Sequence, residues 1–196
     1  MTAGHLQIVV CGAGPVADVA RLVSAAKEQS WTAAVIATPS AMEFIDVPAI
    51  EDLTGSPVRS SYRSSAGARR SLPAVDALVV APATYNSINK IALGLADNYA
   101  MASVAELIGR RVPTVIVPFV NAALAARLPF RRAVASLRDE GIHVLLGPQD
   151  GWEPHPPGRG DDQQRAFPWT AAFRTAARFA RRTPTTDRSA PDGPVR

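Results

Sequence analysis

Five short apolar runs alternate with helical sequence along most of the chain. They consist largely of Val, Ile, Leu and Ala with little polar alternation, which is typical of strands buried on both faces of a parallel sheet. The predicted strands are Leu6–Cys11, Ala33–Ala37, Asp76–Ala81, Val112–Pro118 and His143–Leu146. This order predicts an α/β fold with a three-layer, doubly wound parallel sheet, Rossmann-like or flavodoxin-like.

Apolar residues at helical spacing fill the segments between these runs. After the turn Gly12-Ala13-Gly14, Pro15 favours the start of a helix that extends to Glu28, because proline loses no useful N–H there. Ser40 is expected as the N-cap of the next helix. The further predicted helices are Ala41–Ile45, Val47–Leu53, Ser87–Leu95, Tyr99–Gly109, Asn121–Gly141 with an interruption at Pro129, and Phe167–Arg181.

Two internal segments lack this periodicity. Gly55–Leu72 is rich in Ser, Arg and Gly and is predicted to be an irregular, partly mobile loop. Gly147–Ala166 carries many Pro, Gly and charged residues, and so long a loop in a compact domain is usually a lid, a binding loop or disordered. We expect a single domain over residues 1–181 and a disordered tail over residues 182–196.

Composition narrows the class of protein. The chain has 196 residues, of which 47% are hydrophobic and 19% charged, as in globular proteins. No apolar run approaches the ~20 residues that cross a bilayer, and no basic stretch precedes the first run, so neither a membrane span nor a signal peptide is predicted. The only cysteine, Cys11, excludes an internal disulfide framework and fits a cytoplasmic protein.

The chain is basic, with a formal net charge of +4. Its basic residues are not clustered as in a recognition helix, and no aromatic stacking platform accompanies them, so a nucleic-acid partner is not predicted. The excess of positive charge is either a solvated face or an attraction for an anionic ligand or substrate carboxylate. No metal site is predicted.

Ligands of doubly wound sheets bind beyond the carboxyl ends of the strands, where four turns of this chain lie: Gly12–Gly14, Thr38–Ser40, Pro82–Ser87 and Pro118–Asn121. A Gly-x-Gly turn lets backbone N–H groups approach an anion. The third glycine and the acidic residue of the NAD fingerprint are absent, which disfavours NAD. Ser40 is either a plain N-cap or an N-cap that also donates to a phosphate.

The segment after the third predicted strand is unusually polar for a helix start. Thr84, Asn86 and Ser87 follow Pro82 and Ala83, whereas an ordinary helix start needs one capping side chain. Farther along the chain, further polar groups interrupt an otherwise apolar sequence, at Lys90, Asp97 and Asn98. The interpretation is a binding turn, with helix capping and a solvated face as the alternative.

The segment Ala81–Ala100 (APATYNSINKIALGLADNYA) closely resembles the PASANT-type segment of the homo-oligomeric flavin-containing cysteine decarboxylases. That family includes the peptidyl-cysteine decarboxylases of lanthipeptide biosynthesis and phosphopantothenoylcysteine decarboxylase. VVCGAGPVADVARLV looks like its first phosphate turn, IATPSAMEFI like its second, and VPFVNAAL lies where it carries Pro-x-Met-Asn. The resemblance covers roughly Leu6–Leu146, in the same order and at compatible spacing.

The resemblance implies an FMN cofactor and an activity. Family members pass electrons from a cysteine thiol to FMN, forming a thioaldehyde, and the adjacent carboxylate then leaves as carbon dioxide. The implied catalytic residues are Asn86 and Asn121. The implied FMN-binding residues are Gly12, Ala13, Gly14, Ser40, Pro82, Ala83, Thr84, Asn86 and Ser87, and the implied substrate contacts include Asn86, Val120 and Asn121. A peptide or small thiol with a carboxylate is the implied substrate, and a homotrimer or homododecamer the implied assembly.

Two positions depart from the family pattern. The family places a catalytic histidine shortly before the strand that leads into the PASANT-type turn. This chain has Ala68 there, or Arg69 with a one-residue gap, and no histidine from residue 6 to residue 142. The methionine of Pro-x-Met-Asn is Val120. Arg69 is a candidate for binding an anionic substrate group, and His155 for reaching over the flavin on a flexible lid.

Three hypotheses of function follow. The first is FMN-dependent oxidative decarboxylation of a C-terminal cysteine of a peptide, which forms a thioenol as in aminovinyl-cysteine biosynthesis and proceeds without the family histidine. The second is a non-catalytic or accessory FMN-binding subunit, whose partner in a heteromeric assembly supplies that histidine. The third is a UbiX-like flavin prenyltransferase.

Overall fold

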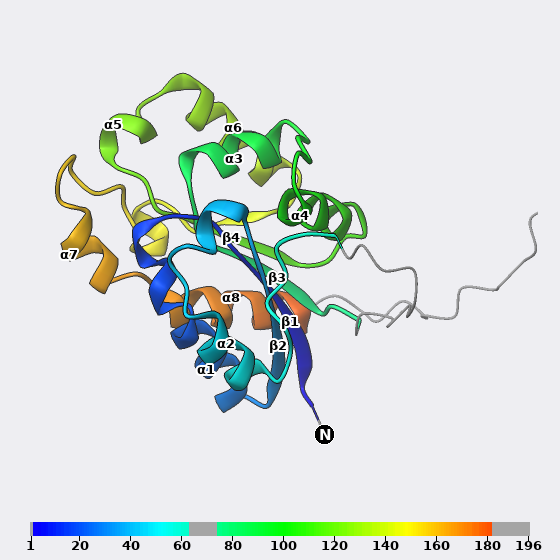
Figure 1. The fold of residues 1–196 in the computed structure, drawn as a ribbon. Helices are drawn as coiled ribbons and strands as arrows, with labels where there is room; N and C mark the ends of the chain where they lie inside the picture. The colour runs from blue at the N-terminus through cyan, green and yellow to red at the C-terminus, as the bar shows by residue number, and fades with distance from the viewer. Residues whose placement is uncertain (1, 63–73, 182–196) are drawn as a thin grey trace, which may run out of the picture.

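A five-stranded parallel sheet forms the centre of the molecule, in a computed structural model that describes residues 2–62 and 74–181 (Figure 1). The strand order is β2-β1-β3-β4-β5, which is the flavodoxin-like order of doubly wound sheets. The strands are β1 (Gly4–Val10), β2 (Trp31–Ala37), β3 (Ala77–Ala83), β4 (Thr114–Pro118) and β5 (His143–Val144). The predicted α/β fold is confirmed.

Helices cover both faces of this sheet (Figure 1). On one face lie α1 (Ala20–Glu28), α2 (Val47–Thr54) and α8 (Trp169–Ala180), and on the other α3 (Tyr85–Ala92), α4 (Tyr99–Gly109) and α6 (Leu128–Asp139). Because side chains alternate along a strand, β1 feeds both cores: Leu6 and Ile8 pack on the α1 side and Val9 on the α4 side. The sheet is therefore buried on both faces.

β1 begins earlier than predicted, and β3 ends later. β1 begins at Gly4, because pairing with β2 already starts at Gly4 opposite Trp31. A Cβ built on Gly4 would lie 2.8 Å from the Trp31 ring, so only glycine fits there. β3 continues through Pro82 to Ala83, which places two residues of the predicted turn inside the strand.

The predicted helix Ala41–Ile45 is wrong. Only a short 3₁₀ helix, η2 (Pro39–Ala41), follows β2. Thr38, and not Ser40, stands at its N-cap position, and no side chain makes a capping bond there. Ser40 lies one residue inside that turn, so its hydroxyl is not used as the predicted N-cap.

Three other helices begin or end differently. The first begins as the 3₁₀ helix η1 (Gly14–Asp18), with proline near its start as predicted, and becomes α-helical only at Ala20. α3 starts at Tyr85 and ends at Ala92, shifted toward the N-terminus from the predicted Ser87–Leu95. The predicted helix Asn121–Gly141 is two helices, α5 (Ala122–Ala125) and α6, and its proline sits in the first turn of α6, where the ring is tolerated.

Residues 147–166 contain regular structure that periodicity did not reveal. They form η3 (Pro148–Asp150) and α7 (Gly160–Arg165). The buried indole N–H of Trp152 donates to the carbonyl of Pro118 over 2.8 Å, and its ring packs edge-on against Phe167. The segment is therefore docked against the carboxyl end of β4.

Part of the predicted loop Gly55–Leu72, and the predicted disordered tail 182–196, lie outside the described residues. The described start of that loop runs beside the edge strand: the N–H of Arg59 donates to the carbonyl of Val35, and the N–H of Ala37 to that of Arg59. In the part of the chain that the structure describes, no helix combines the length and the apolarity needed to cross a membrane.

Candidate functional site

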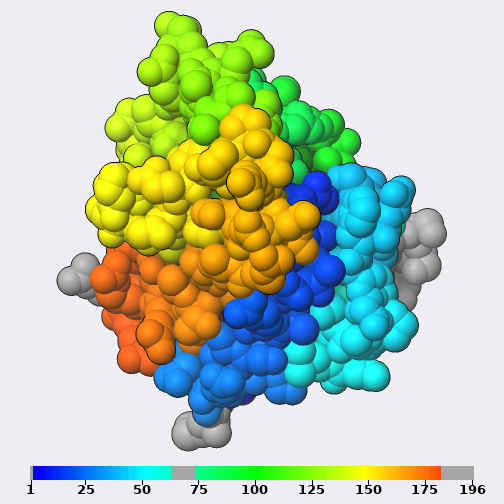
Figure 2. Space-filling model, turned by 90° about the vertical axis from the view of Figure 1, so that its left-hand side faces the viewer, coloured from blue at the N-terminus to red at the C-terminus, as the bar shows by residue number. Residues whose placement is uncertain are grey.

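The carboxyl ends of β1, β2 and β3 bring three of the predicted turns together, on the side of the molecule that Figure 2 faces. β1 lies between the other two strands. The N–H of Cys11 donates to the carbonyl of Pro82 over 3.1 Å, and the N–H of Thr38 donates to that of Val10 over 3.0 Å. The turn that follows Cys11 is thus flanked by the Thr38 turn and by the Thr84 turn.

Gly12 and Gly14 are required by close approach. A Cβ built on Gly12 would lie 2.8 Å from the carbonyl oxygen of Ser40 and 3.0 Å from its Oγ. On Gly14 it would lie 2.6 Å from Oε1 of Gln164 and 3.3 Å from the ring of Phe119. Since neither glycine has a positive φ, space and not backbone conformation selects the residue type.

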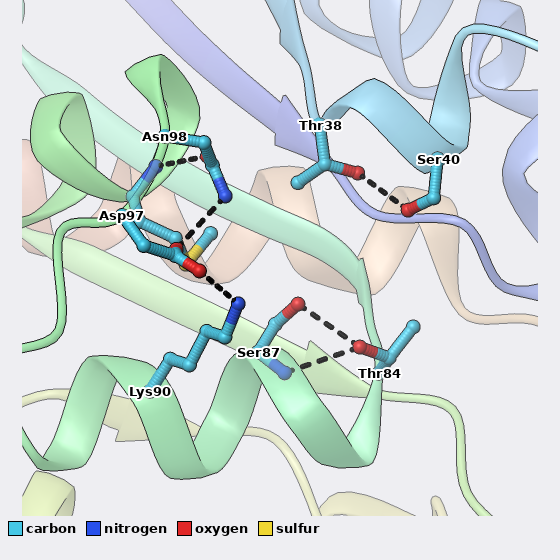
Figure 3. Close-up of polar contacts among 8 residues, drawn as sticks. Thr38, Ser40, Thr84, Ser87, Lys90, Asp97 and Asn98 are labelled. Atoms are coloured by element: carbon cyan, nitrogen blue, oxygen red, sulfur yellow. Dashed lines mark hydrogen bonds and ion pairs between the residues drawn. The ribbon is translucent and has the colours of Figure 1, made fainter.

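Hydroxyl pairs stand on the two flanking turns (Figure 3). Oγ1 of Thr38 and Oγ of Ser40 are 3.3 Å apart, and Oγ1 of Thr84 and Oγ of Ser87 are 2.9 Å apart. Thr84 also caps α3, accepting from the N–H of Ser87 over 3.1 Å. The start of α3 therefore carries both a capping hydroxyl, on Thr84, and a second hydroxyl, on Ser87.

Asn86 is placed differently from its neighbours. It is exposed in the first turn of α3, and its side chain makes no hydrogen bond with the residues that the structure describes. Capping thus accounts for Thr84 and Ser87 but leaves the carboxamide of Asn86 available to a ligand.

The thiol of Cys11 lies beneath this turn. Complete burial raises the pKa of the Cys11 thiol, and hydrogen bonds with the Ser87 side chain and the Thr84 backbone offset part of that rise. A thiol of this kind stays protonated and packs as a small apolar group. The predicted structural role of Cys11 agrees with its position.

The polar residues farther along the chain pair with one another (Figure 3). Lys90 forms an ion pair with Asp97, and this hydrogen bond lowers the pKa of the Asp97 carboxyl. Asn98 caps α4, its Oδ1 accepting from the N–H of Met101 over 3.0 Å. These groups fit the alternative of capping and a solvated face.

On the β4 side, Asn121 follows the strand and caps α5. Its Oδ1 accepts from the N–H of Leu124 over 2.9 Å, which leaves Nδ2 as the donor of that carboxamide. Val120 is only 3% exposed and belongs to the core on the α4 side. Asn121 is therefore accessible at this edge, whereas the side chain of Val120 is buried in the core.

His155 lies beside Asn121. Its backbone N–H donates to the carbonyl of Val120 over 3.3 Å, and its carbonyl accepts from the N–H of Ala122 over 2.8 Å. Its Nδ1 is 3.0 Å from the carbonyl of Pro156, and because a carbonyl only accepts, Nδ1 is the donor of this contact, which leaves Nε2 as the acceptor of the neutral ring. The ring packs against Phe119, with centroids 5.0 Å apart.

The other two histidines of the sequence lie at the beginnings of strands, away from this edge. His5 is in the first half of β1, where its Nδ1 is 2.8 Å from Oγ1 of Thr32. His143 begins β5, and its Nε2 is 3.1 Å from Oδ1 of Asp150. Arg69, predicted to bind substrate, lies outside the described residues.

Sequence reasoning missed Gln164. It belongs to α7, and its side-chain oxygen reaches the Gly12–Gly14 turn. No periodicity marks a helix of six residues rich in polar side chains, so only the tertiary packing reveals this contact.

Known structures are similar to this chain over nearly its whole length. The FMN-dependent cysteine decarboxylase SpaF is 26% identical, with a TM-score of 0.67 and coverage of 89% of this chain and 98% of that one. TvaF, an FMN-dependent cysteine decarboxylase from thioviridamide biosynthesis, is also 26% identical, with a TM-score of 0.65 and coverage of 89% and 99%. The cypemycin decarboxylase CypD, at 19% identity and a TM-score of 0.69 over 92% and 95%, supports the fold alone.

A curated relative matches a shorter stretch. The dihydromethanopterin reductase (acceptor) of Methanosarcina mazei is 36% identical over 63 residues, which are 32% of this chain and only 26% of the reductase. The match therefore spans about a quarter of that protein's length. Residues 1–158 match the family described as Flavoprotein, and since this range covers most of the chain, the protein belongs to the Flavoprotein family.

Proposed function

We propose that this protein binds FMN at the carboxyl edge of its sheet and catalyses the oxidative decarboxylation of a C-terminal cysteine of a peptide. The observation that carries the proposal is the convergence of a close-approach glycine turn, two hydroxyl pairs and two carboxamides at one edge. The likeness to SpaF and TvaF supports it, because both are described as FMN-dependent cysteine decarboxylases.

The residues at the first turn fit a flavin phosphate. Among the described residues, the backbone N–H groups of Gly12 and Gly14 are not paired and can donate to an anion. The hydroxyl of Ser40 lies beside Gly12 and supplies a further donor. Gly12, Ala13, Gly14 and Ser40 would hold the phosphate.

The third turn fits the flavin ring system. Thr84 and Asn86 offer a hydroxyl and an amide at the surface of this turn, and the small buried residues Pro82, Ala83 and Ser87 lie under them. When bound, FMN supplies the acceptor for the two electrons that the cysteine loses. The protein's part is to hold the thiol-bearing carbon and its carboxylate in place and to keep water out.

Asn86 and Asn121 would orient the substrate carboxylate. Nδ2 of Asn121 is the free donor of that side chain, and the exposed carboxamide of Asn86 is a second one. A neutral His155 offers Nε2 as an acceptor for a substrate proton. The buried side chain of Val120 would support the adjacent Asn121, and Arg69 is proposed as a cationic contact. The reaction would then proceed without a histidine just before β3.

The proposal includes a cytoplasmic homotrimer or homododecamer. Large apolar side chains are exposed at Leu124 and Leu128, on α5 and α6 after Asn121, and at Leu93 and Leu95, beyond the far end of α3. Exposed apolar side chains of this size favour contact with another subunit. A heteromeric partner that supplies a histidine is the alternative assembly.

The test is incubation of the purified full-length protein and FMN with peptides that end in cysteine, followed by mass spectrometry. Carbon dioxide and two hydrogens leave, so the product is lighter by about 46 Da. A peptide ending in serine should not change. Asn86→Asp should slow the reaction because it sets a negative charge against the substrate carboxylate, whereas Asn89→Asp is the matched control, since Asn89 donates to its own helix at the Tyr85 carbonyl.

The lack of a histidine from residue 6 to residue 142 favours a second candidate, an FMN-binding accessory subunit. A protein that binds FMN but leaves every cysteine peptide unchanged would support this candidate. Transfer of a prenyl group to the flavin would instead support a UbiX-like prenyltransferase. A protein without affinity for FMN would contradict all three.

A further inference from the structure

The helix α7 lies against the Gly12–Gly14 turn, although about 150 residues of chain separate the two. In Figure 2 the gold surface of this segment adjoins the blue surface of the first turn. Oε1 of Gln164 approaches Gly14 so closely that a Cβ there would lie 2.6 Å from it. Arg21 of α1 reaches the carbonyl of Arg165 over 3.5 Å, which holds the end of α7 near the same turn.

Two adjacent glutamines of α7 have different surroundings. Nε2 of Gln163 donates to the carbonyl of Glu153 over 3.0 Å and so ties the segment together. The carboxamide of Gln164 is half-buried and makes no hydrogen bond with the residues that the structure describes. The Gln164 carboxamide therefore remains free to bond to a ligand at this turn.

We propose that Gln164 is a ligand of the flavin phosphate and makes the protein prefer FMN over riboflavin. This inference rests on the proposed function, which assigns the Gly12–Gly14 turn to that phosphate. Rotation about the last side-chain torsion exchanges the oxygen and nitrogen of the carboxamide, so Nε2 can face an anion bound at the turn. Riboflavin has no phosphate and gains nothing from this donor.

The position of Gln164 also explains why residue 14 is a glycine. A side chain at residue 14 would meet the carboxamide before any anion did. Glycine there leaves room for the Gln164 carboxamide to reach the turn. Residues 147–166 also carry His155, which pairs with Asn121. This segment therefore contacts both the Gly12–Gly14 turn and the Asn121 turn.

The test is a pair of fluorescence titrations, with FMN and with riboflavin, on the full-length protein. Gln164→Ala should weaken FMN binding about tenfold and leave riboflavin binding unchanged, as expected for the loss of one hydrogen bond to a charged group. Gln164→Glu should weaken FMN binding further, because two negative charges then face each other. Gln163→Ala is the matched control and should keep the wild-type ratio of the two affinities.

The outcomes separate this inference from the proposed function. A wild-type protein that binds no FMN overturns the proposed function and this inference with it. A wild-type protein that binds FMN, together with a Gln164→Ala variant that binds it equally well or more tightly, overturns this inference alone. An equal loss of preference in Gln163→Ala would also contradict it, because the position of the loop and not the Gln164 carboxamide would then explain the preference.

Discussion

The candidate site has two halves that are held in place differently. The turn half consists of residues 12–14, 38–40 and 84–87, and the docked half consists of Asn121 with residues 147–166. In the turn half, hydroxyls bond within their own turn, as Thr84 does with Ser87. In the docked half, the decisive contacts join residues more than 30 positions apart, such as Trp152 with Pro118 and His155 with Asn121.

The two halves are therefore sensitive to different substitutions. The turn half follows directly from buried strands, so its geometry changes only when the strand ends or their glycines change. The docked half is held by the buried indole hydrogen bond of Trp152, by the backbone hydrogen bonds of His155, and by the ring contacts of Phe119, Trp152 and Phe167. Substitutions in the first half should therefore alter ligand binding most, and those in the second, apart from Gln164, should mainly alter stability.

The largest effect is expected for Gly12→Ala in the turn half. The new Cβ would meet the backbone oxygen of Ser40 at 2.8 Å, and a backbone atom cannot swing away as a side chain does. FMN binding should weaken by at least about tenfold, with a loss of about 1–3 kcal/mol in the free energy of unfolding. Titration with FMN and urea unfolding measure the two.

Gly109→Ala is the control for this substitution. Gly109 is the last residue of α4, its φ is not positive, and nothing lies within 4 Å of a Cβ built there. This variant should bind FMN as the wild type does and be equally stable or slightly more stable. Equal FMN affinity in both variants would contradict the role of the Gly12 turn in FMN binding.

In the docked half, Trp152→Phe should remove the anchor on β4. The buried carbonyl of Pro118 would lose its indole donor, which costs about 1–3 kcal/mol in the free energy of unfolding. Trp31→Phe is the matched control, because the indole nitrogen of Trp31 is buried without a partner among the described residues. Urea unfolding of both variants should show the larger loss for Trp152→Phe. Equal losses would show that the hydrogen bond of Trp152 to Pro118 does not stabilise the fold.

A smaller effect is expected at Thr84, where α3 is capped inside the turn half. Thr84→Ala removes the oxygen that accepts from the N–H of Ser87 and should cost about 1 kcal/mol in the free energy of unfolding. Thr84→Ser keeps the acceptor and should restore most of this loss. If thermal unfolding shows the same loss for both, the hydroxyl is not the stabilising group.

The smallest effect concerns His5, outside both halves. Burial lowers the pKa of the His5 imidazole from its ordinary value of 6.5, and the charge of Asp76 opposes that shift. The unfolded chain therefore binds this proton more readily, so His5 stabilises the fold fully above its ordinary pKa and loses that contribution as pH falls.

His5→Gln should flatten this part of the pH dependence. Urea unfolding from about pH 8 down to about pH 5 measures it. The amide of glutamine can still bond to Oγ1 of Thr32, which His5 contacts over 2.8 Å. A pH profile identical to that of the wild type would rule out the contribution of His5.

The sequence predicted the sheet and the turn half because both depend on local patterns. Buried apolar runs identified the five strands, and Gly-x-Gly and Thr84 with Ser87 identified two of the turns. Ser40 was misplaced because the Pro39 turn closes as a 3₁₀ helix and continues into no α-helix. Gln164 and α7 escaped prediction because tertiary contacts and not periodicity hold them.

The most direct test of the central claim is a single turnover without oxygen. The FMN-loaded protein is mixed with one equivalent of a peptide that ends in cysteine, and the visible flavin absorbance is followed. The absorbance should bleach in step with the release of one carbon dioxide per flavin, and the same peptide with an amidated C-terminus should release none. An unbleached flavin with an unchanged cysteine peptide would contradict the claim that this site carries out oxidative decarboxylation.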